Sequence, residues 1–240
     1  MLLKFSDRFS IYPAVIVIFL TGTVPLNCPA QDTTNKGPRV TTDMLAYQKQ
    51  VALDSTKKLV ELRSYVPGII YDLRYTGANN FMQQPMYPDG TKETFLRLPA
   101  AIALAKVQAE LNKKGWGLKV FDAYRPYSVT VKFWELVKDS RYVANPAKGS
   151  GHNRGVAIDV TLIDLQTGEE PDMGTGFDNF SDSAHHSFKK LPGDVLQNRS
   201  LLKNVMEKNG FKALDTEWWH YLFASWSRYE LLDIDFRSLK

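Results

Sequence analysis

The chain has 240 residues, of which 44% are hydrophobic, 12% aromatic and 23% charged, and its formal net charge is +4. At about 100–200 residues per domain, this length suits one large domain or two small ones. The ordinary composition excludes collagen-like, coiled-coil, disulfide-scaffold and globally disordered proteins. No basic stripe interleaved with aromatic residues is visible, so we expect no nucleic-acid partner.

The first 30 residues have the pattern of a secretion signal. Two basic residues precede an apolar run from Ile11 to Leu26, which is shorter than the roughly 20 residues of a membrane-spanning helix. Cys28 and Ala30 supply the small residues that precede a cleavage site. We therefore expect residues 1–30 to be a signal peptide and the protein to be exported, in the periplasm, without a membrane span after cleavage. The alternatives are an uncleaved anchor and lipid attachment through Cys28.

Cleavage after Ala30 would remove Cys28, the one cysteine of the chain. The mature protein would then have neither disulfides nor thiolate ligands. Any metal site would have to be built from histidine and carboxylate side chains, and the chain has four histidines.

Residues 31–43 are polar and rich in Thr, Asn and Pro, which is typical of a disordered tether. The remaining residues, 44–240, are expected to form one domain. The patterns along it predict strands over 66–75, 116–123, 156–163 and 218–223 and helices over 99–114, 127–138 and 201–209. Because strands and helices alternate irregularly between long loops, we expect an α+β fold.

Asp159 is the first residue that points to chemistry. It stands in a strand whose opposite face consists of Val, Ile and Leu, and an unpaired charge there would be costly to bury. His152 precedes it in a glycine-rich loop, and far downstream Glu217 stands three residues before His220.

Two histidines and one aspartate match a catalytic zinc site, in which three protein ligands leave one tetrahedral position for water. Glu217 is suited to take the proton of that water. Its spacing from His220 does not place both side chains on one face of a regular strand. We therefore expect Glu217 at the turn entering the strand or on a bulge.

Each motif could also have a purely structural role, because a His-Asp pair or a Glu-x-x-His alone is usually structural. His185 and His186 compete as a metal pair. However, adjacent residues on an extended chain point to opposite faces, and the preceding residues 181–184 read as an exposed loop.

Residues 150–159, SGHNRGVAID, resemble the SxHxxGxAxD signature of the zinc D,D-peptidases related to Hedgehog. Residues 217–220, EWWH, are similar to the ExWH motif of that family, in the form found in its D-alanyl-D-alanine dipeptidase branch. Further similarities lie in the segments 72–75, 80–81, 122–126 and 173–178. The resemblance runs from about Val66 to Phe223, in order and properly spaced.

The resemblance implies a small antiparallel sheet flanked by helices, and one Zn²⁺ per chain held by His152, Asp159 and His220. It implies Glu217 as catalytic acid and base and Arg125 as the residue that stabilises the oxyanion. Without the resemblance, an ion pair with Asp122 at the surface is the simpler explanation of Arg125.

The resemblance also places Tyr75, Ser150 and Asp178 near the substrate. A core tyrosine, a loop cap and a solvated acid are the plain alternatives for these three. The substrate that it implies is the dipeptide D-Ala-D-Ala.

Three other functions stay open. They are a D,D-carboxypeptidase or an endopeptidase acting on longer cell-wall peptides, and a non-catalytic zinc-binding module. An exported enzyme fits cell-wall turnover or D-Ala scavenging better than antibiotic resistance of the vancomycin type, because that role needs a substrate in the cytoplasm.

Overall fold

A five-stranded sheet forms the centre of the computed structural model, which describes residues 37–239. Its strands, in spatial order, are β3 (Ile70–Tyr71), β5 (Trp116–Asp122), β6 (Ala157–Asp164), β8 (Glu217–Phe223) and β7 (Phe211–Leu214). Neighbouring strands are antiparallel, except that β3 runs parallel to β5 at one edge. The expected α+β class and small sheet are confirmed.

Five α-helices lie in the described part of the chain: α1 (Met44–Leu53), α2 (Leu62–Tyr65), α3 (Leu98–Asn112), α4 (Tyr127–Val137) and α5 (Gly193–Lys208). Pro99 lies in the first turn of α3, where its missing N–H is no loss. Gly115 follows the helix with a φ of +80°, which glycine adopts without strain. Short 3₁₀ segments cover Ser55–Lys57, Arg74–Thr76, His152–Arg154, Asp182–Ala184, Trp226–Arg228 and Phe236–Leu239.

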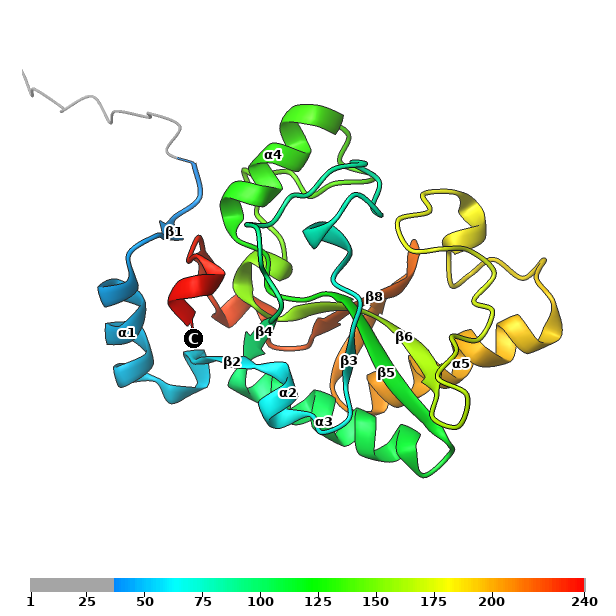
Figure 1. Ribbon diagram of the computed structural model, residues 1–240. Coiled ribbons are helices and arrows are strands. Elements are labelled where there is room, and N and C mark those ends of the chain that lie inside the picture. The colour runs from blue at the N-terminus through cyan, green and yellow to red at the C-terminus, as the bar shows by residue number, and fades with distance from the viewer. Residues whose placement is uncertain (1–36, 240) are drawn as a thin grey trace, which may run out of the picture. The chain divides into compact units, whose positions relative to one another are not determined.

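The two faces of the sheet have different roles. Figure 1 shows α3 and α5 along one side of the sheet and α4 on the other. Ile158, Val160 and Leu162 of β6 belong to the same buried core as the apolar side chains of α3 and α5. Because side chains alternate along a strand, Asp159 lies on the opposite face. The apolar alternation of this strand therefore leaves the aspartate on the side away from these helices.

Two small sheets lie outside the central one. β2 (Leu59–Glu61) pairs antiparallel with β4 (Phe95–Arg97), and β1 (Val40–Thr41) pairs parallel with β9 (Leu231–Leu232). The expected disordered tether is thus wrong for its last residues. Val40 and Thr41 are ordered by backbone pairing, which their polar surroundings in sequence do not reveal.

Two sequence-based boundaries are also wrong. The strand expected over 66–75 is reduced to β3, because α2 precedes it and the chain turns at Gly68, where φ is +80°. The helix expected over 201–209 begins eight residues earlier as α5. Its first two turns are mostly polar, so their apolar periodicity is weak, and they are helical through the burial of Val195 and Arg199.

Two register shifts lie beside the site described below. One falls between Val120 and Asp122 of β5, and the other between Ala213 and Leu214 of β7. Such bulges re-aim a side chain next to an active site. Here they affect the two strands that flank β6 and β8.

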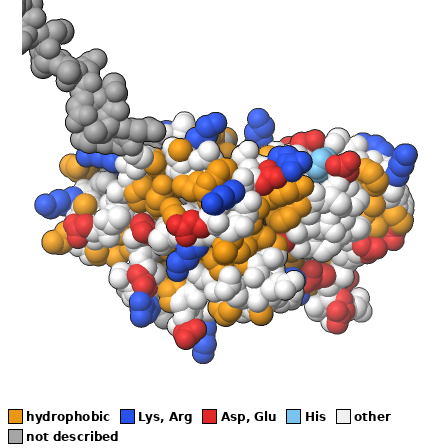
Figure 2. Space-filling model, turned by 90° about the horizontal axis from the view of Figure 1, so that it is seen from above, with side chains coloured by type: hydrophobic (Ala, Val, Ile, Leu, Met, Phe, Trp, Pro, Cys, Tyr) orange, Lys and Arg blue, Asp and Glu red, His pale blue; other side chains and the backbone are white. Residues whose placement is uncertain are grey.

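The surface shows no dominant charge on the face in Figure 2, where acidic and basic side chains are interspersed around hydrophobic ones. Within residues 37–239, no helix has both the length and the apolar character that a membrane span requires. The expected signal peptide, residues 1–30, lies outside the described residues.

Candidate active site

All eight residues singled out from the sequence line one cavity of about 560 Å³. They come from segments far apart in the chain and are Tyr75, Arg125, Ser150, His152, Asp159, Asp178, Glu217 and His220. The cavity therefore collects the expected metal donors, the acid–base group and the substrate-side residues in one place.

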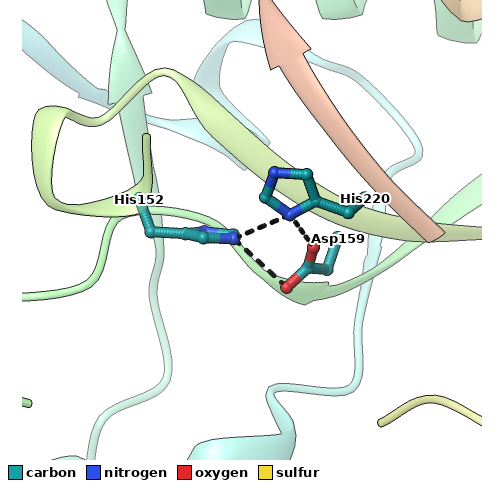
Figure 3. Close-up of side chains that lie close together, drawn as sticks. All are labelled: His152, Asp159 and His220. Atoms are coloured by element: carbon teal, nitrogen blue, oxygen red, sulfur yellow. Dashed lines mark hydrogen bonds and ion pairs between the residues drawn. The ribbon is translucent and has the colours of Figure 1, made fainter. Parts of the chain in front are cut away.

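His152, Asp159 and His220 form a tight triangle of donor atoms (Figure 3). His152 Nε2 lies 3.3 Å from Asp159 Oδ2 and 3.2 Å from His220 Nδ1, and His220 Nδ1 lies 2.9 Å from Asp159 Oδ1. At metal–ligand distances of about 2.0–2.2 Å, two ligand atoms of a tetrahedral zinc site lie about 3.3–3.6 Å apart. The two histidine nitrogens lie on different oxygens of Asp159, and each of the three distances is within a few tenths of an ångström of that spacing, so the donors fit a zinc ion.

Local structure explains how the three donors meet. Asp159 on β6 and His220 on β8 are directly opposite each other in the antiparallel register. His152 lies in the 3₁₀ turn just before β6, where its Nδ1–H donates to the carbonyl of Ala123 at 2.6 Å. That bond fixes the tautomer and leaves the Nε2 lone pair facing the other two donors.

The electrostatics favour an ionised aspartate in this triangle. Burial opposes ionisation of Asp159, but the neighbouring imidazoles of His152 and His220 outweigh it and hold the pKa of Asp159 below its ordinary value. An ionised carboxylate is the form that binds a metal.

Glu217 is the first residue of β8, and its Oε2 lies 4.0 Å from His220 Nδ1. The register shift between Ala213 and Leu214 pairs Leu214 with Glu217 and Ala213 with Tyr221. The expectation of a strand entry or a bulge is confirmed in both respects. Burial raises the pKa of Glu217, although the nearby His220 opposes this. The carboxylate therefore binds a proton more readily than an ordinary glutamate does.

Arg125 follows β5 and is almost fully buried, with 8% of its surface exposed. Its guanidinium donates to Asp122 through Nε at 3.0 Å and Nη2 at 2.8 Å, and it lies 5.1 Å from the Tyr75 ring. The ion pair considered from the sequence exists, but it is buried, and a surface ion pair is wrong. Burial would lower the pKa of Arg125, but Asp122 outweighs it and raises that pKa.

Asp178 and Tyr75 form a second polar pair in the cavity. The Tyr75 hydroxyl donates to Asp178 at 3.1 Å, and the backbone N–H of Phe81 reaches Oδ2 at 3.4 Å. Burial, helped by the charge of Asp159, raises the pKa of Asp178 to about 8. The solvated acid considered for Asp178 is therefore wrong, whereas Tyr75 is both buried and at the cavity wall.

Ser150 caps its own loop as well as lining the cavity. Its Oγ accepts from the N–H of Asn153 at 3.2 Å, and its N–H donates to the Asn153 side chain at 2.9 Å. His185 lines the cavity wall. Among residues 37–239, the donor triangle is the one group of three or more His, Cys, Asp or Glu side chains whose ligand atoms lie close enough to hold a metal ion. The pair of His185 and His186 is therefore not brought together as a metal site.

Sequence reasoning gave no role to an aromatic wall of the cavity or to Tyr87. Phe81 stacks edge-on against Phe133 at 5.2 Å and against Phe180 at 5.4 Å. The hydroxyl of Tyr87 donates to Asp122 behind Arg125. Phe81 stands in one of the matching segments, but no local pattern in the sequence marks Tyr87.

Comparisons with known proteins identify the family of the chain. A family model described as Peptidase_M15, D-ala-D-ala dipeptidase, matches residues 55–229. The chain is 34% identical to the D-alanyl-D-alanine dipeptidase of Escherichia coli (strain K12) over 180 residues, covering 75% of this chain and 92% of that one. It is also 34% identical to the D-alanyl-D-alanine dipeptidase of Enterococcus faecalis (strain ATCC 700802 / V583) over 174 residues, covering 64% and 85%.

Two solved structures show more distant likeness. The LdcB LD-carboxypeptidase has 18% identity and a TM-score of 0.40, with 70% of this chain and 68% of that chain covered. VanYB in complex with D-Alanine-D-Alanine has 13% identity and a TM-score of 0.38, with 57% and 76% covered. The match of the family model over most of the chain, together with the two dipeptidases, shows that the chain belongs to the Peptidase_M15 family of D-ala-D-ala dipeptidases.

Proposed function

We propose that the protein is a zinc-dependent dipeptidase that hydrolyses D-alanyl-D-alanine. One observation carries the proposal: the triangle of His152, Asp159 and His220, with Glu217 beside it, shares one cavity with the half-buried carboxylate of Asp178. The names of the related dipeptidases support the choice of substrate.

One Zn²⁺ per chain is the metal that fits two imidazole nitrogens and one carboxylate at these spacings. When bound, zinc lowers the pKa of water toward about 7 and polarises a carbonyl oxygen. His152 is held for this role by its bond to the Ala123 carbonyl, and Asp159 supplies a negative charge from the strand beside it.

Glu217 moves the proton. As a carboxylate it takes a proton from the attacking water, and as a carboxylic acid it returns that proton to the leaving amine. Its raised pKa assists the second half of the cycle, because the proton must be held while the carbon–nitrogen bond breaks. Its place beside His220 keeps it next to the reacting water.

Arg125 stabilises the oxyanion that forms on the peptide carbonyl. Its charge is permanent and its guanidinium is held in a buried position at the cavity wall. A charge that is already in place needs no reorganisation as the oxyanion develops.

Asp178 and Tyr75 bind the free amino group of the substrate, and Ser150 lies at the cavity wall as a further polar contact. Asp178 gives up the proton that its raised pKa holds in the free protein when an ammonium group binds, and the carboxylate then gains a strong charge-assisted bond from that group. Because an acylated amine lacks that charge, this pair favours a free dipeptide over longer cell-wall peptides.

The test is hydrolysis of D-Ala-D-Ala, L-Ala-L-Ala and N-acetyl-D-Ala-D-Ala by the purified protein. We expect cleavage of the free D,D-dipeptide that is lost in Glu217→Ala and after chelation. Glu207→Ala, on the exposed face of α5, is the matched control and should keep wild-type activity. Equal rates on the acetylated substrate would overturn the free-amine requirement, and full activity in Glu217→Ala would overturn the mechanism.

Export is part of the proposal and is supported by the signal-like pattern of residues 1–30. In the periplasm the enzyme would act in cell-wall turnover or in scavenging D-Ala. Fractionation of cells expressing the full chain should recover the activity outside the cytoplasm. Recovery with the cytoplasmic fraction would reverse the assignment, and labelling with a radioactive fatty acid would reveal lipid attachment at Cys28.

A further inference from the structure

Only some of the N–H groups of the Arg125 guanidinium are bound by Asp122. Its Nε and Nη2 both donate to the same oxygen of Asp122, Oδ2, at 3.0 and 2.8 Å. The guanidinium also lies within hydrogen-bonding range of the Tyr87 hydroxyl, and Arg125 lines the cavity. Asp122 and Tyr87 therefore hold one part of the guanidinium, at a residue that lines the cavity.

Asp122 is itself fixed from the other side. It is fully buried, and its second oxygen, Oδ1, accepts from the Tyr87 hydroxyl at 2.5 Å. A buried carboxylate with a donor on each oxygen has a single orientation, since turning it would leave a charge unpaired.

The backbone explains why these groups meet. Asp122 lies at the register shift of β5 and is paired with Asp159 across the sheet. Tyr87 is tied to the cavity wall, because its N–H and that of Met86 both donate to the carbonyl of Tyr75, at 3.0 and 2.9 Å. Tyr87 and Tyr75 also pack edge to face at 5.8 Å.

We propose that Tyr87 and Asp122 are positioning residues that act through Arg125, fixing its guanidinium so that it meets the substrate oxyanion. Neither residue touches the reacting atoms. The proposal rests on the proposed function for the identity of the substrate but not for the geometry of Arg125.

A purely structural role makes a different prediction. If the pair of Tyr87 and Asp122 only stabilises the fold, its loss lowers the free energy of unfolding and leaves kcat unchanged. If it positions Arg125, its loss lowers kcat much more than it changes KM, because the oxyanion is present only in the transition state.

The experiment uses the zinc-loaded protein and the variants Asp122→Asn and Tyr87→Phe, alone and combined with Arg125→Ala. Removing one oxyanion donor costs on the order of 10²–10³ in kcat. For Asp122→Asn we expect a loss of kcat that is within about tenfold of that range. For Tyr87→Phe we expect kcat to fall about 3–10-fold, and in both variants KM should change less than about threefold. In the Arg125→Ala background, each change should cost less than about twofold, because the group through which they act is gone.

Tyr47→Phe is the matched control. Tyr47 is as buried as Tyr87, and its hydroxyl accepts from the N–H of Leu59 away from the cavity. Its loss should leave kcat unchanged. Because Asp122 Oδ2 also lies 3.6 Å from His152 Nδ1, zinc content is measured for every variant and should stay at wild-type level.

A second readout does not need turnover. The Arg125 Nε–H, buried against Asp122, should give a separate NMR resonance that exchanges slowly with water, identified by its absence in Arg125→Ala. Asp122→Asn should remove its protection, and Tyr87→Phe should shift it. An unchanged resonance in both variants, or equal losses of kcat with and without Arg125, would overturn the proposal. A wild-type protein that is inactive on D-Ala-D-Ala would overturn the proposed function, while the resonance still decides the positioning role.

Discussion

Replacing Asp178 with Asn should stabilise the metal-free protein, and the gain should grow as the pH rises. The folded protein raises the pKa of Asp178 to about 8, chiefly through burial, from an ordinary value near 3.8. Between these two values the unfolded chain has lost the proton and the folded protein keeps it. Folding stability therefore falls as pH rises through this window, and it is unaffected by Asp178 below about pH 4.

The magnitude follows from the width of the window. At 1.36 kcal/mol per unit, the interval from 3.8 to pH 7 sets an upper bound of about 4 kcal/mol for the destabilisation by Asp178. An Asn side chain stays neutral at every pH, so it does not cause this destabilisation. It loses part of the hydrogen bonding to Tyr75 and Phe81, which costs about 1 kcal/mol. We expect Asp178→Asn to gain about 1–3 kcal/mol at pH 7 and almost nothing at pH 4.

Urea unfolding of chelator-treated protein between pH 4 and 8 measures this difference. Asp139→Asn is the control, because the pKa of Asp139 is lowered to about 2 by hydrogen bonds from Arg141. Its effect should therefore not depend on pH between 5 and 8. A pH-independent effect of Asp178→Asn would refute the reasoning, since it would mean that Asp178 ionises alike in both states. The same variant should lose about 10–100-fold in kcat/KM on D-Ala-D-Ala, the cost of a lost charged bond.

Three further predictions concern the chemistry. Glu217→Gln should lower kcat by about 10²–10⁴ with zinc content unchanged, as metal analysis beside steady-state kinetics would check; an unchanged kcat would contradict the acid–base role. His152→Ala should lose most of its zinc on gel filtration, whereas the half-buried His186→Ala should keep it; equal retention would count against the donor triangle. Arg125→Lys should lower kcat by about 10²–10³ with little change in KM, and a change in KM alone would assign Arg125 to substrate binding.

The sequence predicts the site better than it predicts the elements around it. His152, Asp159, Glu217 and His220 stand in short motifs whose residue types match a metal centre, and the structure places them together. α3 and α4 are also predicted well, since their apolar periodicity and terminal residues are local signals. These features depend on neighbours within a few positions of the chain.

The features that the sequence does not predict depend on distant partners. The ordered pairing of Val40 comes from Leu231, and the early start of α5 comes from the burial of Val195 and Arg199. Tyr87 gains its contact with Asp122 from a strand 35 residues further along the chain, beside the register shift of β5. No pattern in the surrounding residues records these contacts, because each is created by packing after the local structure has formed.

The parallel pairing of β1 with β9 joins the two ends of the described chain. Contacts between residues so far apart form late in folding, because a long loop must close before they stabilise anything. Among the described residues, the last strand along the chain is thus needed to complete the first. In a chain that we propose is exported, the segment of β1 therefore stays without its strand partner until residues 231 and 232 have been made.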